Sequence, residues 1–176
     1  MMADQIEDRR GRAMNYEEKP QIDIKLVRQS AIVRAKTFQA IGHFIYQFSQ
    51  LEFTIRAVLT AYLQLPDQYF DAVTGPYDFR MLVAVTSKVG QIKYPERADT
   101  IKAMFKECFD LMTVRNHIAH GLWSDGIMEW SVRHYNREKL EGKHIPYTSD
   151  QINEFAKQAQ MLLQKVMGFN PQHGSR

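Results

Sequence analysis

The feature that most constrains the fold is an uninterrupted helix-forming stretch between about Asp23 and Leu65. It contains no proline and a single glycine, Gly42. From Ile41 onward its apolar residues recur at the three- and four-residue spacing of one helix face, at Ile41, Phe44, Ile45, Phe48, Leu51, Ile55, Val58, Leu59 and Tyr62. We expect the part before Ile41 either to continue this helix or to form a separate short one. Pro66 ends the stretch, because the residue before a proline disfavours helical backbone.

Three further helices are predicted. Asp78 is placed to cap a helix that runs to about Val89. Pro95 opens the next helix, which stops at Gly121 and carries a buried side made of Ile101, Met104, Phe105, Cys108, Leu111 and Met112. Thr148 and Gln151 form a capping box that starts the last helix, which Gly168 ends. The apolar face of this last helix comprises Ile152, Phe155, Ala159, Leu162, Leu163 and Val166.

The periodicity changes between the last two helices. The run "LWSDGIMEWSVRHY" (122–135) has Asp125-Gly126 between short β-prone segments, which predicts a hairpin with a two-residue turn. We expect a polar loop over Asn136–Pro146. The predicted fold class is therefore all-α, a bundle of four to five helices with a short β-hairpin inserted before the last helix. Residues 21–168 would form a single domain, with a mobile or weakly helical arm at 1–20 and a tail at 169–176.

Composition limits the class of protein further. No run of about 18 apolar residues occurs, so we expect no membrane span. The N-terminal twenty residues are charged and lack the apolar core of a signal peptide. The single cysteine, Cys108, lies in an apolar stripe, which favours a core residue over a nucleophile and fits a reducing, cytoplasmic location. A net charge of +3 is compatible with a polyanionic partner without requiring one.

Two charged residues fall on apolar helix faces. Glu52 lies within about 60° of the stripe centred on Phe48. Arg115 occupies the next buried position after Leu111 and Met112. Burying a charge is costly unless it is paired, and an arginine cannot escape by losing its proton. We therefore predict an ion pair between Glu52 and Arg115 across the two helices, serving either a functional site or only the helix register.

Arg115 also begins a polar cluster, "RNHIAHG" (115–121), at the end of its helix. Asn116 and His120 are four residues apart and share a helix face. Arg115 and His120 are five apart, which places them about 140° around an ideal helix. We expect them to share a groove only if the helix distorts at its end, or if a second copy presents the same face across a two-fold axis.

At Arg115, Asn116 and His120 the sequence resembles the HEPN superfamily, whose small helical bundles carry an arginine, a polar residue and then a histidine. The run "FSQLEFTIRAVL" (48–59) is similar to the first long helix of that family with its inward glutamate, and the capped helix after "IPYTSDQI" also fits. The resemblance spans most of residues 38–168. It implies a HEPN-like bundle, a face-to-face homodimer and, in many members, an endoribonuclease that needs no metal or other cofactor. Such members act on RNA as toxins with an antitoxin or regulatory protein partner, in phage defence or in RNA processing, whereas others are non-catalytic.

Arginine and histidine side chains can together catalyse the cleavage of RNA. RNA supplies its own nucleophile, the 2′-hydroxyl, so cleavage needs a base, an acid and a cation for the phosphorane. Histidine can fill either proton-transfer role near neutrality, and the arginine fork suits charged phosphate oxygens. We therefore assign Arg115, Asn116 and His120 as catalytic, with two copies of His120 dividing the acid and base roles.

Other side chains could support this site. Glu52 and His117 are assigned supporting roles, although His117 fits a solvated surface position equally well. Trp123 and Trp130 could stack on unpaired bases or pack the hairpin onto the bundle.

Two alternatives remain. His117 and His120 have the spacing of helical metal ligands, with Glu52 as a third donor, but a nearby arginine repels a cation. The second alternative is a non-catalytic module for dimerisation or for binding RNA or a protein partner.

Overall fold

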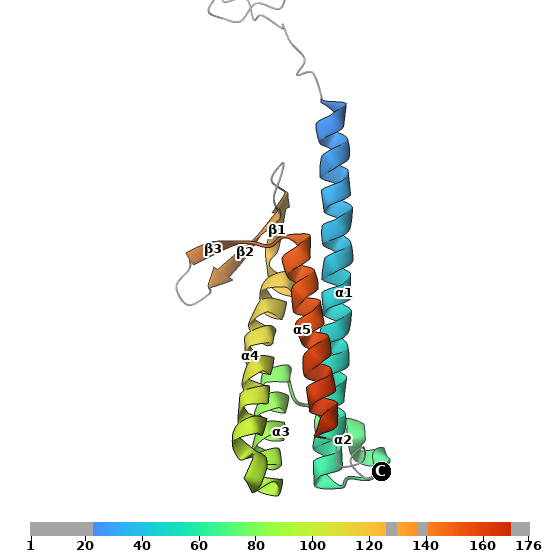
Figure 1. The fold of residues 1–176 in the computed structure, drawn as a ribbon, viewed down its shortest axis with the longest axis vertical. Helices are drawn as coiled ribbons and strands as arrows, with labels where there is room; N and C mark the ends of the chain where they lie inside the picture. The colour runs from blue at the N-terminus through green and yellow to red at the C-terminus, as the bar shows by residue number, and fades with distance from the viewer. Residues whose placement is uncertain (1–22, 126–129, 137–140, 170–176) are drawn as a thin grey trace, which may run out of the picture.

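The structure, a computed structural model, describes residues 23–125, 130–136 and 141–169. Its elements run α1 (Ile24–Leu63), α2 (Phe70–Thr74), α3 (Phe79–Lys93), α4 (Ala98–His120), β1 (Leu122–Asp125), β2 (Trp130–Asn136), β3 (Glu141–Pro146) and α5 (Ser149–Gly168). Short 3-10 turns at Asp67–Tyr69 and Pro95–Arg97 precede α2 and α4. Helices α1, α3, α4 and α5 run lengthwise beside one another, and the sheet stands at one end of α4 and α5 (Figure 1). The predicted bundle with a β-insertion before the last helix is confirmed.

The longest element, α1, is one continuous helix of 40 residues. Asp23 caps its start by accepting from the backbone N–H groups of Lys25 and Leu26, and it ends where Gln64 adopts left-handed backbone at φ 55°. The segment before Ile41 is thus a continuation and not a separate helix. The buried side chains follow the predicted stripe closely, at Thr37, Ala40, Phe44, Phe48, Leu51, Ile55, Val58, Leu59 and Tyr62.

The other helix boundaries follow the predicted signals. Asp78 Oδ1 accepts from the Met81 N–H at 2.7 Å, and α3 continues to Lys93, one turn beyond the expected end. Thr148 and Gln151 form the predicted capping box at the start of α5. Helix α1 packs mainly on α5 and α3, and α3 packs mainly on α4. The buried apolar side chains of these helices form one cluster, which Val132 of β2 joins.

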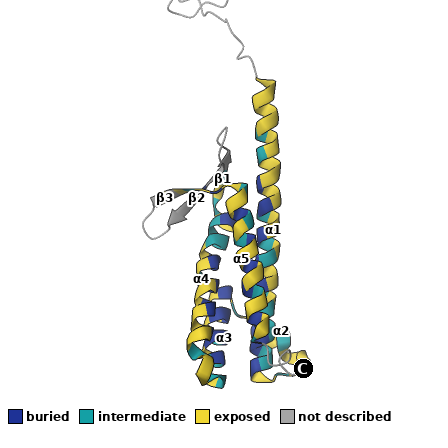
Figure 2. Cartoon of the chain, viewed as in Figure 1, coloured by how far each residue is buried: buried dark blue, intermediate teal, exposed yellow. Residues whose placement is uncertain are grey.

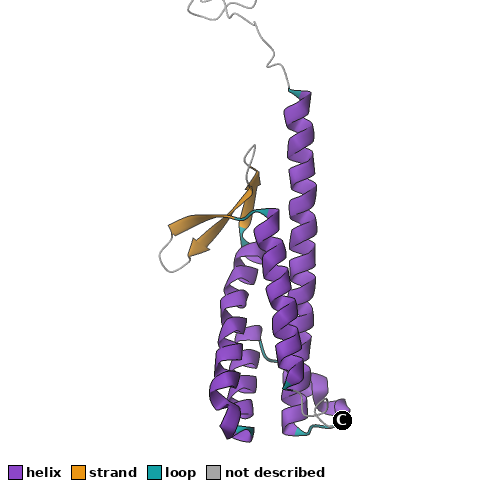
Figure 3. Ribbon diagram, viewed as in Figure 1, coloured by secondary structure: helices purple, strands orange, loops and turns teal. Residues whose placement is uncertain are grey.

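The β-insertion differs from the prediction. Strands β1, β2 and β3 form an antiparallel sheet in that order, shown in orange in Figure 3. Asp125 pairs with Trp130, so four residues lie between the strands and the predicted two-residue Asp125-Gly126 turn is wrong. The predicted polar loop over Asn136–Pro146 is also wrong, because Glu141–Pro146 pairs with Ser131–Asn136 as β3. Hydrogen bonding to β2 makes a strand of a polar segment that has little β-pattern of its own.

The junction of α4 and β1 depends on Gly121. Its backbone is extended, at φ −78° and ψ 152°, so conformational freedom is not the reason for a glycine. A Cβ added there would lie 2.0 Å from Cγ1 of Val132 and 2.5 Å from the His117 carbonyl oxygen. Val132 is fully buried. The glycine therefore lets β2 pack directly on the end of α4, beside the cluster at Arg115–His120.

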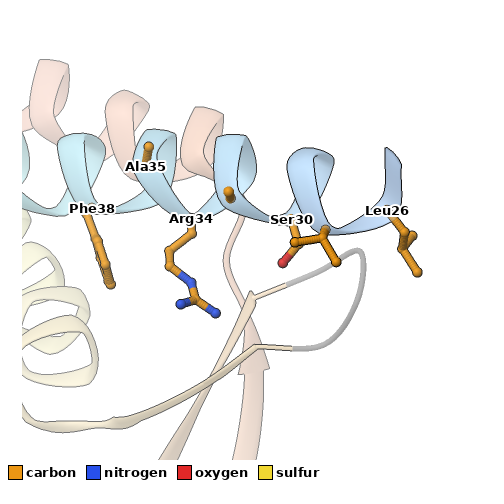
Figure 4. Close-up of a pocket in the computed structure, with 7 residues that line it drawn as sticks. Leu26, Ser30, Arg34, Ala35 and Phe38 are labelled. Atoms are coloured by element: carbon orange, nitrogen blue, oxygen red, sulfur yellow. The ribbon is translucent and has the colours of Figure 1, made fainter. Parts of the chain in front are cut away.

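The N-terminal part of α1 extends past the ends of the other helices and is largely exposed (Figures 1 and 2). Its large apolar side chains face solvent to a high degree, with exposures of 66% for Ile24, 54% for Val27 and 56% for Phe38. A groove of about 500 Å³ runs along this part of α1. Figure 4 shows Leu26, Ser30, Arg34 and Phe38 along the helix.

No helix within residues 23–125, 130–136 and 141–169 combines the length and apolar character needed to cross a membrane. The predicted arm at 1–20 and residues 170–176 of the predicted tail lie outside the described residues.

Substitution of Gly121 with alanine should destabilise the fold. The new methyl group must displace Val132 or the end of α4, and overpacking of this kind costs about 1–3 kcal/mol in the free energy of unfolding. Urea denaturation followed by circular dichroism measures the change. The matched control is Gly42→Ala in α1, where nothing lies within 4 Å of the added Cβ and the helix should gain about 0.5–1 kcal/mol. Equal stability of the Gly121→Ala and wild-type proteins would contradict this account of the junction.

Cys108 should be chemically inert in the folded protein. Its side chain is fully buried, and burial, aided by the charge of Glu107, raises the pKa of the thiol to about 12. The thiolate that reacts with disulfide reagents is therefore scarce at pH 8. We expect no labelling by a thiol-specific chromogenic disulfide at pH 8 in buffer and stoichiometric labelling in denaturing urea. Rapid labelling of the native protein would show that this stripe of α4 is open to solvent.

Candidate functional site

The predicted catalytic residues meet within one protomer at the end of α4. Arg115 Nη1 lies 3.0 Å from His120 Nε2 and 3.3 Å from Asn116 Oδ1. A guanidinium only donates, so the His120 nitrogen accepts this hydrogen bond and its proton sits on the other ring nitrogen. The expectation that Arg115 and His120 meet only through a distorted helix end or a second copy is wrong. Helix α4 stays helical to His120, and the long arginine side chain spans the separation.

Arg115 rests on the aromatic core of the bundle. The residue is half-buried, and its Cζ lies 5.9 Å from the ring centroid of Phe48, in the range of a cation–π contact. Phe48 in turn packs against Phe79 at a centroid distance of 4.5 Å. Phe48 of α1, which packs on Phe79 of α3, thus supports one side of the guanidinium, while the exposed His120 contacts it from the end of α4.

The predicted ion pair between Glu52 and Arg115 is wrong. Glu52 Oε1 instead accepts from Arg56 Nη2 at 2.6 Å, one helical turn further along α1. The side chains of Arg56 and Glu52 are 18% and 30% exposed, so neither charge is fully desolvated. Arg115 needs no carboxylate because it is only half-buried and donates to His120 and Asn116. The four-residue spacing of Glu52 and Arg56 is the sequence signal that indicates this pairing.

Sequence reasoning missed the role of Arg56. Its guanidinium donates to the backbone carbonyls of Thr74 and Tyr77 as well as to Glu52. Thr74 is the last residue of α2, and Tyr77 lies in the connection between α2 and α3. Arg56 therefore fixes this connection to α1 and holds the Glu52 carboxylate in place.

A cleft of about 380 Å³ opens beside Arg115. Its polar lining comes from α1, the start of α3 and α4, and comprises Glu52, Asp78, Arg80, Arg115 and Asn116. Its apolar lining comprises Phe48, Phe79 and Met112. The cleft thus combines two carboxylates with two guanidinium groups, which suits a ligand with both hydrogen-bond donors and acceptors.

His117 is not a solvated surface residue. It is half-buried, and its Nδ1 lies 3.1 Å from the Tyr147 hydroxyl oxygen in the connection between β3 and α5. Burial raises the pKa of Tyr147 above its ordinary value, so the phenol keeps its proton further into alkaline pH. This hydrogen bond ties the end of α4 to the segment that leads into α5.

Trp123 packs on the core of the bundle. Trp123 is half-buried against the core, and its indole N–H donates to the Ile118 carbonyl at 3.0 Å. These contacts correspond to the packing role that we weighed against base stacking. Trp130 begins β2, but its side chain lies outside the described part of the structure.

The metal-site alternative finds no support in these positions. His117 contacts Tyr147, His120 contacts Arg115 and Glu52 contacts Arg56, so the three predicted ligands have different neighbours. Within the residues that the structure describes, no group of three His, Cys, Asp or Glu side chains is arranged to hold a metal ion.

Comparison with known proteins adds no family. No protein-family model, no curated protein and no solved structure matches the chain.

Removal of Arg56 should loosen the connection between α2 and α3. Arg56→Met keeps the aliphatic stem but leaves two backbone carbonyls and Glu52 without their donor, which should cost about 1–3 kcal/mol in the free energy of unfolding. The control is Lys106→Met, whose ion pair with Asp110 joins side chains that are 77% and 70% exposed. An exposed pair of that kind is worth about 0–1 kcal/mol. Equal effects of the two substitutions in urea denaturation would contradict the role given to Arg56.

Proposed function

We propose that this protein is a metal-independent endoribonuclease that cleaves RNA by transesterification at Arg115, Asn116 and His120. The observation that carries the proposal is the 3.0 Å contact between the Arg115 guanidinium and the His120 imidazole, at the mouth of a polar cleft. A guanidinium beside an imidazole supplies two of the three groups that phosphate-diester cleavage by an internal nucleophile needs, the cation and the proton acceptor. The resemblance of these residues to the HEPN motif supports the same reading.

In the proposed reaction Arg115 turns from His120 to the phosphate, which frees the Nε2 lone pair of the imidazole. That nitrogen accepts the 2′-hydroxyl proton while the 2′-oxygen attacks the adjacent phosphorus. The bond from phosphorus to the 5′-oxygen breaks, and an acid gives that oxygen a proton. The products are a 2′,3′-cyclic phosphate and a 5′-hydroxyl. Arg115 binds the phosphoryl oxygens on which charge accumulates, and Asn116 holds the arginine through its side-chain oxygen.

The reaction needs a second proton-transfer group. His117 lies against Tyr147, so it is not aimed at the same phosphate as His120. A second copy of His120, brought in by a homodimer, would supply the acid. The proposal therefore includes a homodimer that acts on RNA. It also includes a toxin or phage-defence role in the cytoplasm, with an antitoxin or regulatory protein as partner.

A second candidate is a non-catalytic interaction module. The observation that favours it is the exposed apolar side of α1 around Val27 and Phe38, beside the groove of about 500 Å³. An apolar surface of this kind marks a protein–protein contact more often than a catalytic site.

The wild-type protein should cleave single-stranded RNA in excess EDTA and leave 2′,3′-cyclic phosphate ends. Arg115→Ala and His120→Ala should each lower the cleavage rate by about 100-fold or more, since each removes a group that acts on the transition state. Both should stay folded, because neither side chain is part of the buried core. Gel analysis of labelled RNA measures the rate, and mass spectrometry identifies the ends.

His43→Ala is the matched control, because His43 is exposed on α1 and its side chain hydrogen-bonds only to Gln47 among the described residues. This variant should cleave like the wild type. Loss of cleavage with EDTA would indicate a metal enzyme. Absence of cleavage by the wild type would favour the interaction module.

A further inference from the structure

Glu52 lines the cleft beside Arg115, and only one of its two carboxylate oxygens has a hydrogen-bond partner among the described residues. Arg56 binds Oε1 of Glu52, and Arg56 is itself held by the carbonyls of Thr74 and Tyr77. The other carboxylate oxygen, Oε2, has no hydrogen bond or ion pair within the described residues. Glu52 therefore presents a pre-positioned acceptor from a rigid helix, which is how specific ligand contacts are built.

The lining of the cleft also includes the guanidinium of Arg80. Arg80, in the first turn of α3, is exposed and forms no side-chain hydrogen bond or ion pair among residues 23–125, 130–136 and 141–169. Asp78 differs, because its Oδ1 caps α3 through the Met81 N–H. A donor fork on α3 and an acceptor on α1 thus line the same cleft.

Among the four RNA bases, guanine fits this pair of groups best. Its Watson–Crick edge carries two adjacent donors, N1–H and N2–H, which one carboxylate can accept together. Its O6 and N7 are adjacent acceptors, which an arginine fork binds in bidentate fashion. Adenine and cytosine each place a lone pair next to their amino group, so a carboxylate facing that edge is repelled. Uracil offers only one donor.

The size of the cleft is consistent with this ligand. A volume of about 380 Å³ lies at the lower end of the roughly 300–1,000 Å³ found for small-ligand sites. Arg115 and Asn116 belong both to this lining and to the proposed catalytic group. A base seated in the cleft is therefore adjacent to the phosphate that Arg115 would bind.

We propose that the cleft is a guanine subsite, in which Glu52 accepts from N1–H and N2–H and Arg80 donates to O6 and N7 of a guanine next to the scissile phosphate. This inference rests on the proposed ribonuclease function. Guanine in a free nucleotide has the same edges, so the experiment must separate an RNA base from a soluble guanine nucleotide.

The test uses labelled single-stranded RNA with one guanine in a sequence of the other three bases. Cuts should fall at a fixed position next to the guanine. Replacing it with inosine, which lacks the N2 amino group, should slow cleavage by about tenfold. Glu52→Gln should lose the preference for guanine over inosine, because the amide cannot accept two hydrogen bonds from one edge and still satisfy Arg56. Arg80→Ala should also reduce the preference for guanine, without altering stability, since Arg80 is exposed.

Glu107→Gln is the matched control, because Glu107 is exposed on α4 and pairs with Lys165 outside the cleft. It should keep the guanine preference, and circular dichroism should show that all three variants fold. Cleavage that depends on Arg115 and His120 but shows no guanine preference would overturn the subsite and leave the ribonuclease intact. Guanine preference that survives Glu52→Gln would overturn the assignment of Glu52.

A binding measurement separates the subsite from the reaction. By isothermal titration calorimetry, guanosine 3′-monophosphate should bind the wild-type protein about tenfold more tightly than adenosine 3′-monophosphate, and Glu52→Gln should remove the difference. If no RNA is cleaved, this result alone still supports a guanine site while the ribonuclease fails. Equal affinities would overturn the subsite. Tight binding of GTP without any guanine preference in RNA would assign the cleft to a free nucleotide and overturn the RNA proposal.

Discussion

The apolar face of α1 between Ala40 and Tyr62 is the surface against which the other long helices pack. Its fully buried side chains, among them Phe44, Leu51 and Ile55, belong to the one core cluster that the helices share. Because this face is continuous, α3 and α5 can lie along the same helix, and α4 is placed by its packing on α3. The end of α4 therefore comes to rest over Phe48, and the position of Arg115 follows from that.

Arg115 illustrates how a polar site can be built on such a core. A fully buried guanidinium would need an anion, but a half-buried one can lie over an aromatic ring and donate to neutral partners. His120 and Asn116 supply those partners from the same helix. Gly121 then brings the sheet directly onto the end of α4, which leaves His120 exposed beside it. The cation and the imidazole thus share one helix terminus and remain accessible.

Much of the fold could be predicted from residue spacing and helix caps. The stripe from Phe44 to Tyr62, the cap at Asp78 and the capping box at Thr148 each depend on local geometry, which sequence shows directly. Strand β3 could not be predicted, because Glu141–Pro146 becomes a strand only through pairing with β2.

The site was predicted only in part for a similar reason. Arg115, Asn116 and His120 could be identified from the motif, but the contact between Arg115 and His120 was not foreseen, because helix spacing does not account for the reach of the arginine side chain. The predicted partner of Glu52 was wrong because the distant Arg115 was considered and the local, four-residue spacing to Arg56 was not.

The central claim is that His120 and Arg115 form one phosphate-binding, proton-transferring unit, and histidine ring NMR tests it most directly. The ligand is an RNA in which every 2′-oxygen is methylated, so that it binds without being cleaved. The account predicts that the His120 ring signals shift on titration, that those of His43 do not, and that the His120 shift disappears in Arg115→Ala. A His120 ring that is indifferent to the RNA, or that responds equally without Arg115, would contradict it.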